Sequence, residues 1–168
     1  MLFSTEYSSP LGVLLLTSDG VSLTGLWMDS QPRPSAELME KNDLPIFYRT
    51  KDWLDAYFRG ESPSPNALPL APGGTEFQKQ VWKILLEIPY GESRTYGDIA
   101  REIAARRSIP RMSPQAVGGA VGRNPIGIII PCHRCMGTKG RLTGYAGGLD
   151  NKRWLLRHEG IPFKEELK

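Results

Sequence analysis

The pattern of apolar and polar positions in the first half of the chain predicts a few strands and one helix. Residues 12–28, GVLLLTSDGVSLTGLWM, contain two apolar stretches separated by a turn sequence at residues 18–20, which is typical of a β-hairpin. Residues 48–60 place four apolar side chains at helical spacing and end in glycine, so we expect a helix there. Residues 30–45 are polar and contain prolines, which favours a loop with at most one short helix.

The second half of the chain has helical periodicity over most of its length. Residues 75–88 form a strongly amphipathic pattern that opens on a threonine N-cap. Residues 96–106 and 114–124 predict two short helices joined by a loop, an arrangement that indicates a helix-turn-helix. The β-branched run at residues 126–130 predicts a strand, and residues 148–160 predict a last helix.

A proline-rich segment separates these two halves. Residues 61–74, ESPSPNALPLAPGG, contain four prolines and two glycines without periodicity, and predict a linker between a domain at 1–72 and a domain at 73–168. The charge balance changes sign at the same place. Residues 1–74 carry five basic against nine acidic side chains, and residues 75–168 carry 16 against nine, so the second half is expected to meet an anion such as nucleic acid.

Composition and length narrow the class of protein. The 168 residues suit one or two small domains, and a hydrophobic fraction of 40% with 23% charged residues is typical of a folded globular chain. No apolar run is long enough to predict a membrane span, and no basic segment precedes the first apolar run as in a signal peptide. Two cysteines do not make a disulfide framework, so a reducing, cytoplasmic location is expected.

Both cysteines lie in the sequence IIIPCHRCMG, residues 128–137, which allows several interpretations. A redox C-x-x-C pair opens a helix, whereas a glycine-rich sequence without helical period follows here. A zinc site needs four ligands at workable spacing, and His133 lies between the two cysteines with no second ligand pair in the sequence. Neither a redox site nor a metal site is therefore favoured.

A nucleophilic cysteine is the more favourable interpretation. A thiol needs a base beside it to become a thiolate at neutral pH, and the base needs a third group to orient it. His133 is adjacent to Cys132, and Glu159 in the last predicted helix is the acidic residue that we expect to orient the histidine. The alternative is that the histidines are ordinary core or surface residues.

The second of the paired helices has an unusual glycine content. Gly118, Gly119 and Gly122 lie in its interior, where each glycine costs roughly 1 kcal/mol relative to alanine. A bare helix surface of this kind allows another backbone to approach closely. Two candidates for that backbone are open at this point: a partner helix, or a nucleic acid lying against the helix.

Several ordered motifs together resemble the alkylguanine-DNA alkyltransferases, the methylated-DNA–protein-cysteine methyltransferases of DNA repair. These motifs are IPCHRC, NP eight residues before its first cysteine, TGYAGG after it, LLRHEG near the end, and GGTEFQKQVWKILLEIPYGESRTYGDIA upstream. The resemblance covers roughly residues 75–160. It implies an α/β N-terminal ribonuclease-H-like domain and a mainly α C-terminal domain with a winged helix-turn-helix. It also implies direct, irreversible transfer of an alkyl group from O6 of guanine, after base flipping, by a single-turnover protein without cofactor or metal.

The resemblance assigns roles to four residues around the thiol. Cys132 matches the alkyl acceptor, and His133 matches the base that deprotonates it through a water molecule. Glu159 matches the carboxylate that holds the histidine. Asn124 matches the asparagine that ties the helix-turn-helix to the active-site loop.

The resemblance also assigns residues to the base pocket. Tyr96 matches the tyrosine that crowds the 3′ phosphate and helps to turn the nucleotide out, and Tyr145 matches a residue beside the flipped base. Gln115 stands where many members have an arginine that fills the space left by the flipped base. A glutamine can hydrogen-bond the orphaned partner base but brings no charge, and Arg111 or Arg123 is the alternative for this role.

Double-stranded DNA containing O6-alkylguanine is the implied partner, with O4-alkylthymine left open, and the protein is expected to act as a monomer away from membranes. The residues expected to contact DNA are Thr95, Ala116, Gly118, Gly119, Arg123 and Arg134. The loop RRSIPRMS is a few residues longer than in short members. Cys135 replaces a common aliphatic residue, and is interpreted either as a small apolar substitution or as a redox partner of Cys132.

Overall fold

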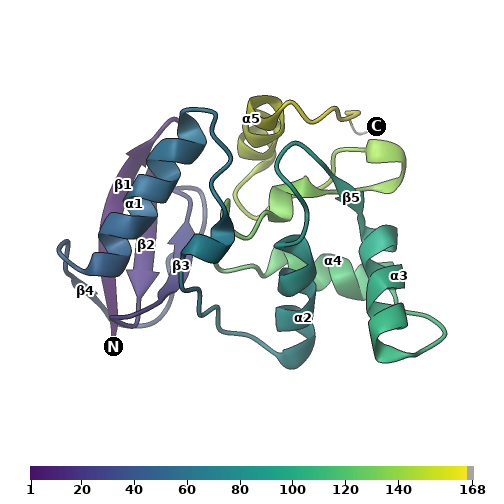
Figure 1. The fold of residues 1–168 in the computed structure, drawn as a ribbon, viewed down its shortest axis with the longest axis horizontal. Helices are drawn as coiled ribbons and strands as arrows, with labels where there is room; N and C mark the ends of the chain where they lie inside the picture. The colour runs from purple at the N-terminus through teal and green to yellow at the C-terminus, as the bar shows by residue number, and fades with distance from the viewer. Residues whose placement is uncertain (166–168) are drawn as a thin grey trace. The chain divides into compact units, whose positions relative to one another are not determined.

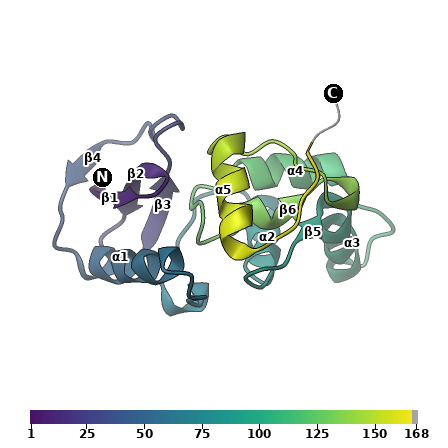
Figure 2. The same cartoon turned by 90° about the horizontal axis from the view of Figure 1, so that it is seen from above.

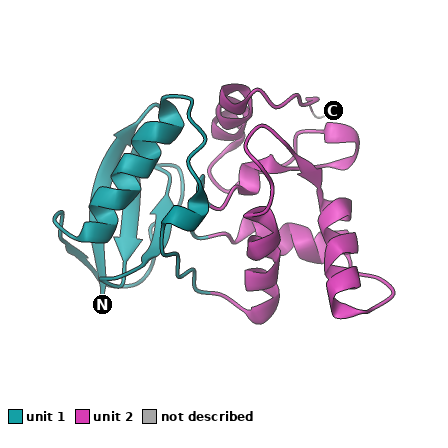
Figure 3. Cartoon of the chain, viewed as in Figure 1, with its two compact units in different colours: residues 1–73, 125–129 teal, residues 74–124, 130–168 magenta. Residues whose placement is uncertain are grey.

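The computed structural model describes residues 1–165, which form two compact units (Figure 3). The first unit holds residues 1–73 together with the short segment 125–129. The second holds residues 74–124 and the chain from residue 130 onward. No helix within residues 1–165 is both long and apolar enough to cross a membrane.

The first unit is a four-stranded sheet with one helix along a face of it (Figures 1 and 2). Its elements are β1 (Leu2–Ser9), β2 (Gly12–Ser18), β3 (Leu23–Trp27), β4 (Leu38–Glu40) and α1 (Pro45–Phe58). The strand order is β3-β2-β1-β4, with β1–β2 and β2–β3 antiparallel and β1–β4 parallel. The predicted hairpin and the predicted helix are therefore confirmed.

The core of this unit lies between the sheet and α1. Leu14 and Leu16 of β2 are fully buried, and so are Phe47 and Leu54 of α1. Pro45 occupies the first turn of the helix, where its missing N–H is not needed. The prediction of loop or helix for residues 30–45 is wrong in one respect, because β4 is a strand that a polar three-residue sequence does not reveal.

The proline-rich segment 61–74 is fixed to the sheet. Leu23 of β3 donates its N–H to the Pro69 carbonyl at 2.9 Å, and its own carbonyl accepts from Ala71 N–H at 2.8 Å. The Trp53 indole also donates to the Ser64 carbonyl at 2.9 Å. A proline removes a backbone donor but leaves its carbonyl free, and β3 uses the carbonyl of Pro69, whereas α1 holds the segment through the carbonyl of Ser64.

The strand predicted at residues 126–130 is wrong. The segment pairs with β3 at a single bridge, Leu26 with Ile126, and then turns. Ile128 has φ of +67° and Ile129 N–H donates to the Gly127 carbonyl at 2.7 Å. A β-branched residue is strained in this region of φ, so local preference is overridden by the need to turn the chain toward Cys132.

The second unit is mainly helical. Its helices are α2 (Glu76–Leu85), α3 (Tyr96–Arg107), α4 (Pro114–Gly122) and α5 (Leu149–Glu159). Its shorter elements are β5 (Arg94–Thr95), β6 (Cys135–Met136), and the 3₁₀ turns η2 (Cys132–Arg134) and η3 (Thr138–Gly140), while the 3₁₀ turn η1 (Pro65–Ala67) belongs to the first unit. All four predicted helices of the second half are confirmed, and β5 pairs with β6 in parallel.

Helix α4 packs against both α2 and α3, and one hydrogen bond fixes its position. The buried Trp82 indole of α2 donates to the Ala120 carbonyl of α4 at 2.8 Å. Ser113 caps the start of α4, because its hydroxyl accepts from Ala116 N–H at 3.3 Å. This packing sets the orientation of the glycine-bearing helix in its unit.

The capping box of α2 gives a direct test of the local physics. Thr75 Oγ1 accepts from Gln78 N–H at 3.1 Å, and Gln78 Oε1 accepts from Thr75 N–H at 3.0 Å. We expect Thr75→Ala to lower the free energy of unfolding by about 1 kcal/mol, because the Gln78 N–H loses its side-chain partner. Urea unfolding of Thr75→Ala and Thr75→Ser measures this, and the serine variant, which keeps the oxygen, is expected to retain most of the stability. Equal loss in both variants would contradict the capping role.

Candidate active site

Cys132 opens the turn η2 and lines a small cavity. Cys132 is 6% exposed. The cavity has a volume of about 330 Å³. The residues that line it are Tyr96, Gly118, Val121, Gly122, Cys132, Gly144, Tyr145 and Ala146. The sequence-predicted thiol and both sequence-predicted tyrosines therefore meet at one cavity, together with the glycine face of α4.

The environment of Cys132 keeps its thiol protonated at neutral pH. Burial raises the pKa of the thiol, and this outweighs the hydrogen bonds from Asn124 and Tyr145 and the charge of Lys152, which act to lower it. A thiol in this state is a weak nucleophile until a base removes its proton. The site consequently needs a base next to the sulfur.

Asn124 connects the end of α4 to the segment that carries the thiol. It is buried, and its Nδ2 donates to the Ile130 carbonyl at 2.8 Å. Its backbone N–H donates to the Val121 carbonyl at 3.2 Å, and its side chain also hydrogen-bonds Cys132. One side chain thus couples helix position to thiol position.

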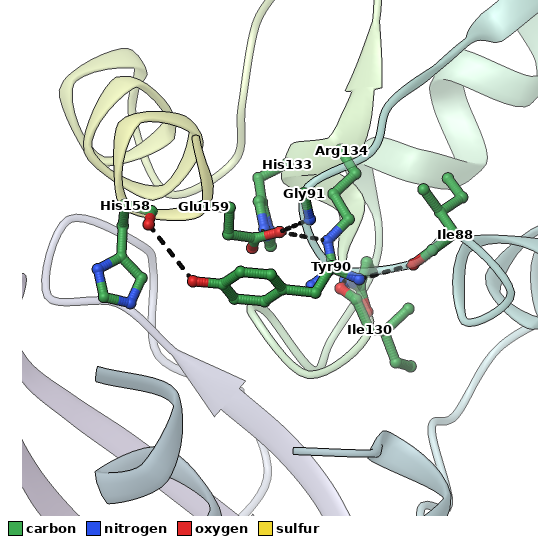
Figure 4. Close-up of polar contacts among 9 residues, drawn as sticks. Ile88, Tyr90, Gly91, Ile130, His133, Arg134, His158 and Glu159 are labelled. Carbon is green, nitrogen blue, oxygen red and sulfur yellow. Dashed lines mark hydrogen bonds and ion pairs between the residues drawn. The ribbon is translucent and has the colours of Figure 1, made fainter. Parts of the chain in front are cut away.

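His133 and Glu159 form a buried pair (Figure 4). His133 Nε2 lies 2.5 Å from Glu159 Oε2, and both side chains are fully buried. Burial lowers the pKa of His133, so the ring is neutral at pH 7. Because the carboxylate only accepts, Nε2 carries the proton and Nδ1 carries a lone pair. Within residues 1–165, Nδ1 is buried without a hydrogen-bond partner.

Glu159 stays ionised because positive and polar groups converge on it (Figure 4). Arg134 Nε donates to Oε1 at 2.7 Å, and Gly91 N–H donates to the same oxygen at 3.1 Å. Burial raises the pKa of Glu159, but the hydrogen bonds from His133 and Arg134 and the positive charge of Arg134 outweigh burial and bring it to about 2. The pair is therefore a carboxylate with a neutral histidine.

The expected contact between Arg134 and DNA is corrected by the structure. Arg134 is 8% exposed, and its Nη1 donates to the Ile88 carbonyl at 2.7 Å while Nε donates to Glu159. A guanidinium satisfied in this way inside the protein is not available on a surface. The positive charge of Arg134 pairs with the buried Glu159 carboxylate rather than with a phosphate.

Lys152 belongs to the site and was missed from the sequence. It is 1% exposed, and its Nζ donates to the Cys135 carbonyl at 2.8 Å and to Thr143 Oγ1 at 3.3 Å. Burial lowers the pKa of Lys152, while the neighbouring thiols act in the opposite direction. A signal existed: Lys152, Leu155 and Glu159 lie at i, i+3 and i+7 on the buried stripe of α5.

A second, larger hollow adjoins the cavity lined by Cys132, which we call the acceptor cavity. The two share Tyr96 and Gly118 in their walls. Its volume is about 610 Å³, and the first turns of α3 and α4 line it. Thr95 and Gln115 lie on its wall, and Gln115 Oε1 accepts from the Ser113 hydroxyl at 3.0 Å. The Tyr96 hydroxyl is hydrogen-bonded to Thr143 Oγ1 at 2.8 Å.

The outer face of α4 is bare. Ala116, Gly119, Gly122 and Arg123 are exposed. A Cβ added at Gly119 or Gly122 would meet no described atom within 4 Å, so no helix in residues 1–165 uses these glycines for close packing. Of the two explanations for the glycine content, a partner helix within the described chain finds no support at these two positions.

The second cysteine is a buried thiol away from the cavity that Cys132 lines. Both cysteines are free thiols, and burial raises the pKa of Cys135 to about 12. Cys135 lies fully buried in β6. Within residues 1–165, no group of three or more His, Cys, Asp or Glu side chains is placed to hold a metal ion.

The ionised state of Glu159 gives a prediction for stability against pH. Its folded pKa of about 2 lies below the ordinary value of 4.5, so its contribution of roughly 3 kcal/mol is present above pH 4.5 and is lost as pH falls toward 2. We expect the unfolding midpoint of the wild type to fall more steeply between about pH 5 and pH 3 than that of Glu159→Gln, which cannot titrate. Parallel pH dependence in urea unfolding of the two proteins would contradict this.

Comparison with known proteins places the chain in a family. Residues 76–161 match the model of the 6-O-methylguanine DNA methyltransferase DNA-binding domain, and residues 2–72 match that of its ribonuclease-like domain. A methylated-DNA–protein-cysteine methyltransferase of Haemophilus influenzae is 44% identical over 163 residues, covering 96% of this chain and 88% of the relative. One from Methanosarcina acetivorans is 46% identical over 161 residues, covering 95% and 99%.

A solved structure agrees with these relatives. The crystal structure of Mycobacterium tuberculosis OGT in complex with DNA matches with a TM-score of 0.80 and 43% identity, covering 94% of this chain and 92% of that one. The two-domain layout, with a sheet domain followed by a helical domain, is shared. The resemblance seen around the Pro-Cys-His-Arg motif is thus confirmed, and the chain belongs to the 6-O-methylguanine DNA methyltransferase family.

Proposed function

We propose that this protein repairs DNA by moving an alkyl group from O6 of guanine to Cys132 in one irreversible step. The observation that carries the proposal is the arrangement around the thiol. A buried, protonated Cys132 lines a cavity, and the neighbouring His133 is neutral, with a buried Nδ1 that lacks a partner in residues 1–165. The names of the family and of its relatives point to the same chemistry.

The first step is removal of the thiol proton. His133 Nδ1 accepts it, through a water molecule, and the charge that develops on the ring is stabilised by Glu159 at 2.5 Å. The Asn124 and Tyr145 hydrogen bonds and the Lys152 charge favour the thiolate over the thiol. These two hydrogen bonds and the Lys152 charge therefore offset part of the cost of burying the thiolate that the base creates.

The second step is displacement at the alkyl carbon. The Cys132 sulfur forms a bond to that carbon, the carbon–O6 bond breaks, and its electron pair goes to the guanine. Burial raises the pKa of Tyr96, so its hydroxyl stays protonated at pH 7 and supplies a proton to the leaving guanine. The tyrosinate regains a proton from solvent as His133 releases its own. The thioether is stable, so the protein acts once.

Access to O6 requires the damaged nucleotide to turn out of the DNA double helix. We assign α3 and α4 to a winged helix-turn-helix whose glycine-bearing helix lies in the minor groove, with Tyr96 crowding the 3′ phosphate. The bare face of α4 supports this assignment. The contacts proposed for DNA are those of Thr95, Ala116, Gly118, Gly119 and Arg123. O6-alkylguanine specificity, a monomeric state and a cytoplasmic location stay predictions.

Intact-mass measurement tests the function directly. After mixing with a duplex that contains O6-methylguanine, we expect a gain of one methyl group in place of one thiol hydrogen. The gain is abolished in Cys132→Ser and kept in Cys135→Ser, because only Cys132 lines the acceptor cavity. Duplex binding without any mass gain would instead support a lesion-signalling protein. A disulfide-linked mass shift that needs both cysteines would support a redox protein.

The exposed Gln115 gives a second test. It lies beside the acceptor cavity, on the wall of the adjoining 610 Å³ hollow. With a fluorescent base analogue at the target position, we expect a modest loss of flipping in Gln115→Ala and a gain in Gln115→Arg, because a longer cationic side chain fills the vacated space and attracts phosphate. Unchanged flipping in both variants would remove Gln115 from this role, and Arg123→Ala then tests the alternative.

A further inference from the structure

The loop between α2 and β5 makes three contacts with the buried Glu159–Arg134 pair and one with the neighbouring His158 (Figure 4). The Ile88 carbonyl accepts from Arg134 Nη1 at 2.7 Å, and Gly91 N–H donates to Glu159 Oε1 at 3.1 Å. Tyr90 lies between these residues and makes the other two contacts. Its hydroxyl donates to the His158 carbonyl at 3.3 Å, and its ring faces the Arg134 guanidinium.

The hydroxyl contact lies at the end of α5. Glu159 is the last residue of that helix, and Gly160 ends it in the left-handed conformation with its N–H directed at the Leu156 and Arg157 carbonyls. A helix C-terminus is also the negative end of the helix dipole, which disfavours a carboxylate there. The Tyr90 hydroxyl gives the His158 carbonyl a donor, and His158 precedes Glu159 in the chain.

The ring contact acts on the opposite charge. The Arg134 Cζ lies 5.8 Å from the centre of the Tyr90 ring, within range of a cation–π attraction. Arg134 donates to Glu159 at 2.7 Å and supplies the positive charge that keeps this carboxylate ionised. Tyr90 therefore contacts Arg134 through its ring, and contacts the residue before Glu159 through its hydroxyl.

We infer that Tyr90 is a positioning residue for alkyl transfer: it holds Glu159 and Arg134 where Glu159 fixes the proton of His133 on Nε2. The inference rests on the proposed function and adds a residue to it. Tyr90 acts through Glu159 and Arg134 rather than on the reacting atoms. The charged groups that act on His133 are Glu159 and Lys152 from α5 and Arg134 from η2. Tyr90 contacts Arg134 directly and reaches Glu159 through the backbone of His158.

Loss of this restraint has a defined chemical effect. Glu159 raises the proton affinity of His133 against burial, which lowers it. A looser Glu159–His133 contact makes the histidine a weaker base, so the transfer rate falls. The protonated fraction of His133 at low pH falls as well, and the acid limb of the rate profile moves to lower pH. Simple loss of stability lowers the fraction of active protein but moves neither the rate constant nor this limb.

The experiment is single-turnover methyl transfer from an O6-methylguanine duplex as a function of pH. The variants are Tyr90→Phe, which removes the hydroxyl alone, and Tyr90→Leu, which also removes the aromatic ring. Tyr48→Phe is the matched control, since Tyr48 is 57% exposed in the first unit. We expect about a fivefold lower rate constant for Tyr90→Phe, at least tenfold for Tyr90→Leu, no change for the control, and unchanged duplex affinity.

A nitrogen NMR measurement on His133 separates this inference from the proposed function. The His133 Nε2–H group is expected to give a sharp resonance, typical of a strong hydrogen bond, in the wild type. In Tyr90→Phe this resonance is expected to weaken, whether or not alkyl transfer occurs. A wild type that transfers no alkyl group overturns the proposed function alone. If Tyr90→Phe keeps the rate constant, the acid limb and the Nε2–H resonance of the wild type, Tyr90 does not have this role. The Tyr90→Phe result decides this even where Tyr90→Leu does not fold.

Discussion

The buried carboxylate of Glu159 is the constraint on which the active site depends. Its two oxygens accept from two segments, His133 and Arg134 in η2 and Gly91 in the loop before β5. The carboxylate itself belongs to the last residue of α5, so three segments meet at it. An unpaired buried charge costs several kcal/mol, so each partner is required by the others. The carboxylate therefore fixes the mutual position of segments far apart in the sequence, and the thiol lies in one of them.

The same cluster divides the titrating groups into distinct roles. Glu159 is held ionised with its pKa near 2, and burial keeps His133 neutral and Cys132 protonated. A protonated, buried thiol reacts slowly with stray electrophiles, whereas a base with an open Nδ1 lets it react when a substrate fills the cavity. A single-use protein benefits from this restraint, because each wrong reaction consumes one molecule.

Local signals in the sequence were sufficient for the helices and for the residues that we propose to react. A capping threonine and amphipathic spacing located α2, helical spacing located α3, and the adjacency of Cys132 and His133 indicated the proposed nucleophile. Tertiary constraints defeated other inferences. The apolar run at 126–130 turns because the chain must leave β3 for the site, and Arg134 is buried because Glu159 needs its charge. The contact of Ile126 with β3 and the contact of Arg134 with Glu159 both join residues far apart in the chain, so the local sequence shows neither.

The link between the glycine face of α4 and the thiol is carried by Asn124. Trp82 fixes the helix through the Ala120 carbonyl, and Asn124 follows the helix end with bonds to Ile130 and Cys132. A backbone lying against the glycines therefore meets a surface whose distance from the sulfur is set by short, buried hydrogen bonds. Because effective alignment of reacting atoms is worth several orders of magnitude in rate, this rigidity serves the chemistry as much as the binding. The glycines and the asparagine are two parts of one positioning device.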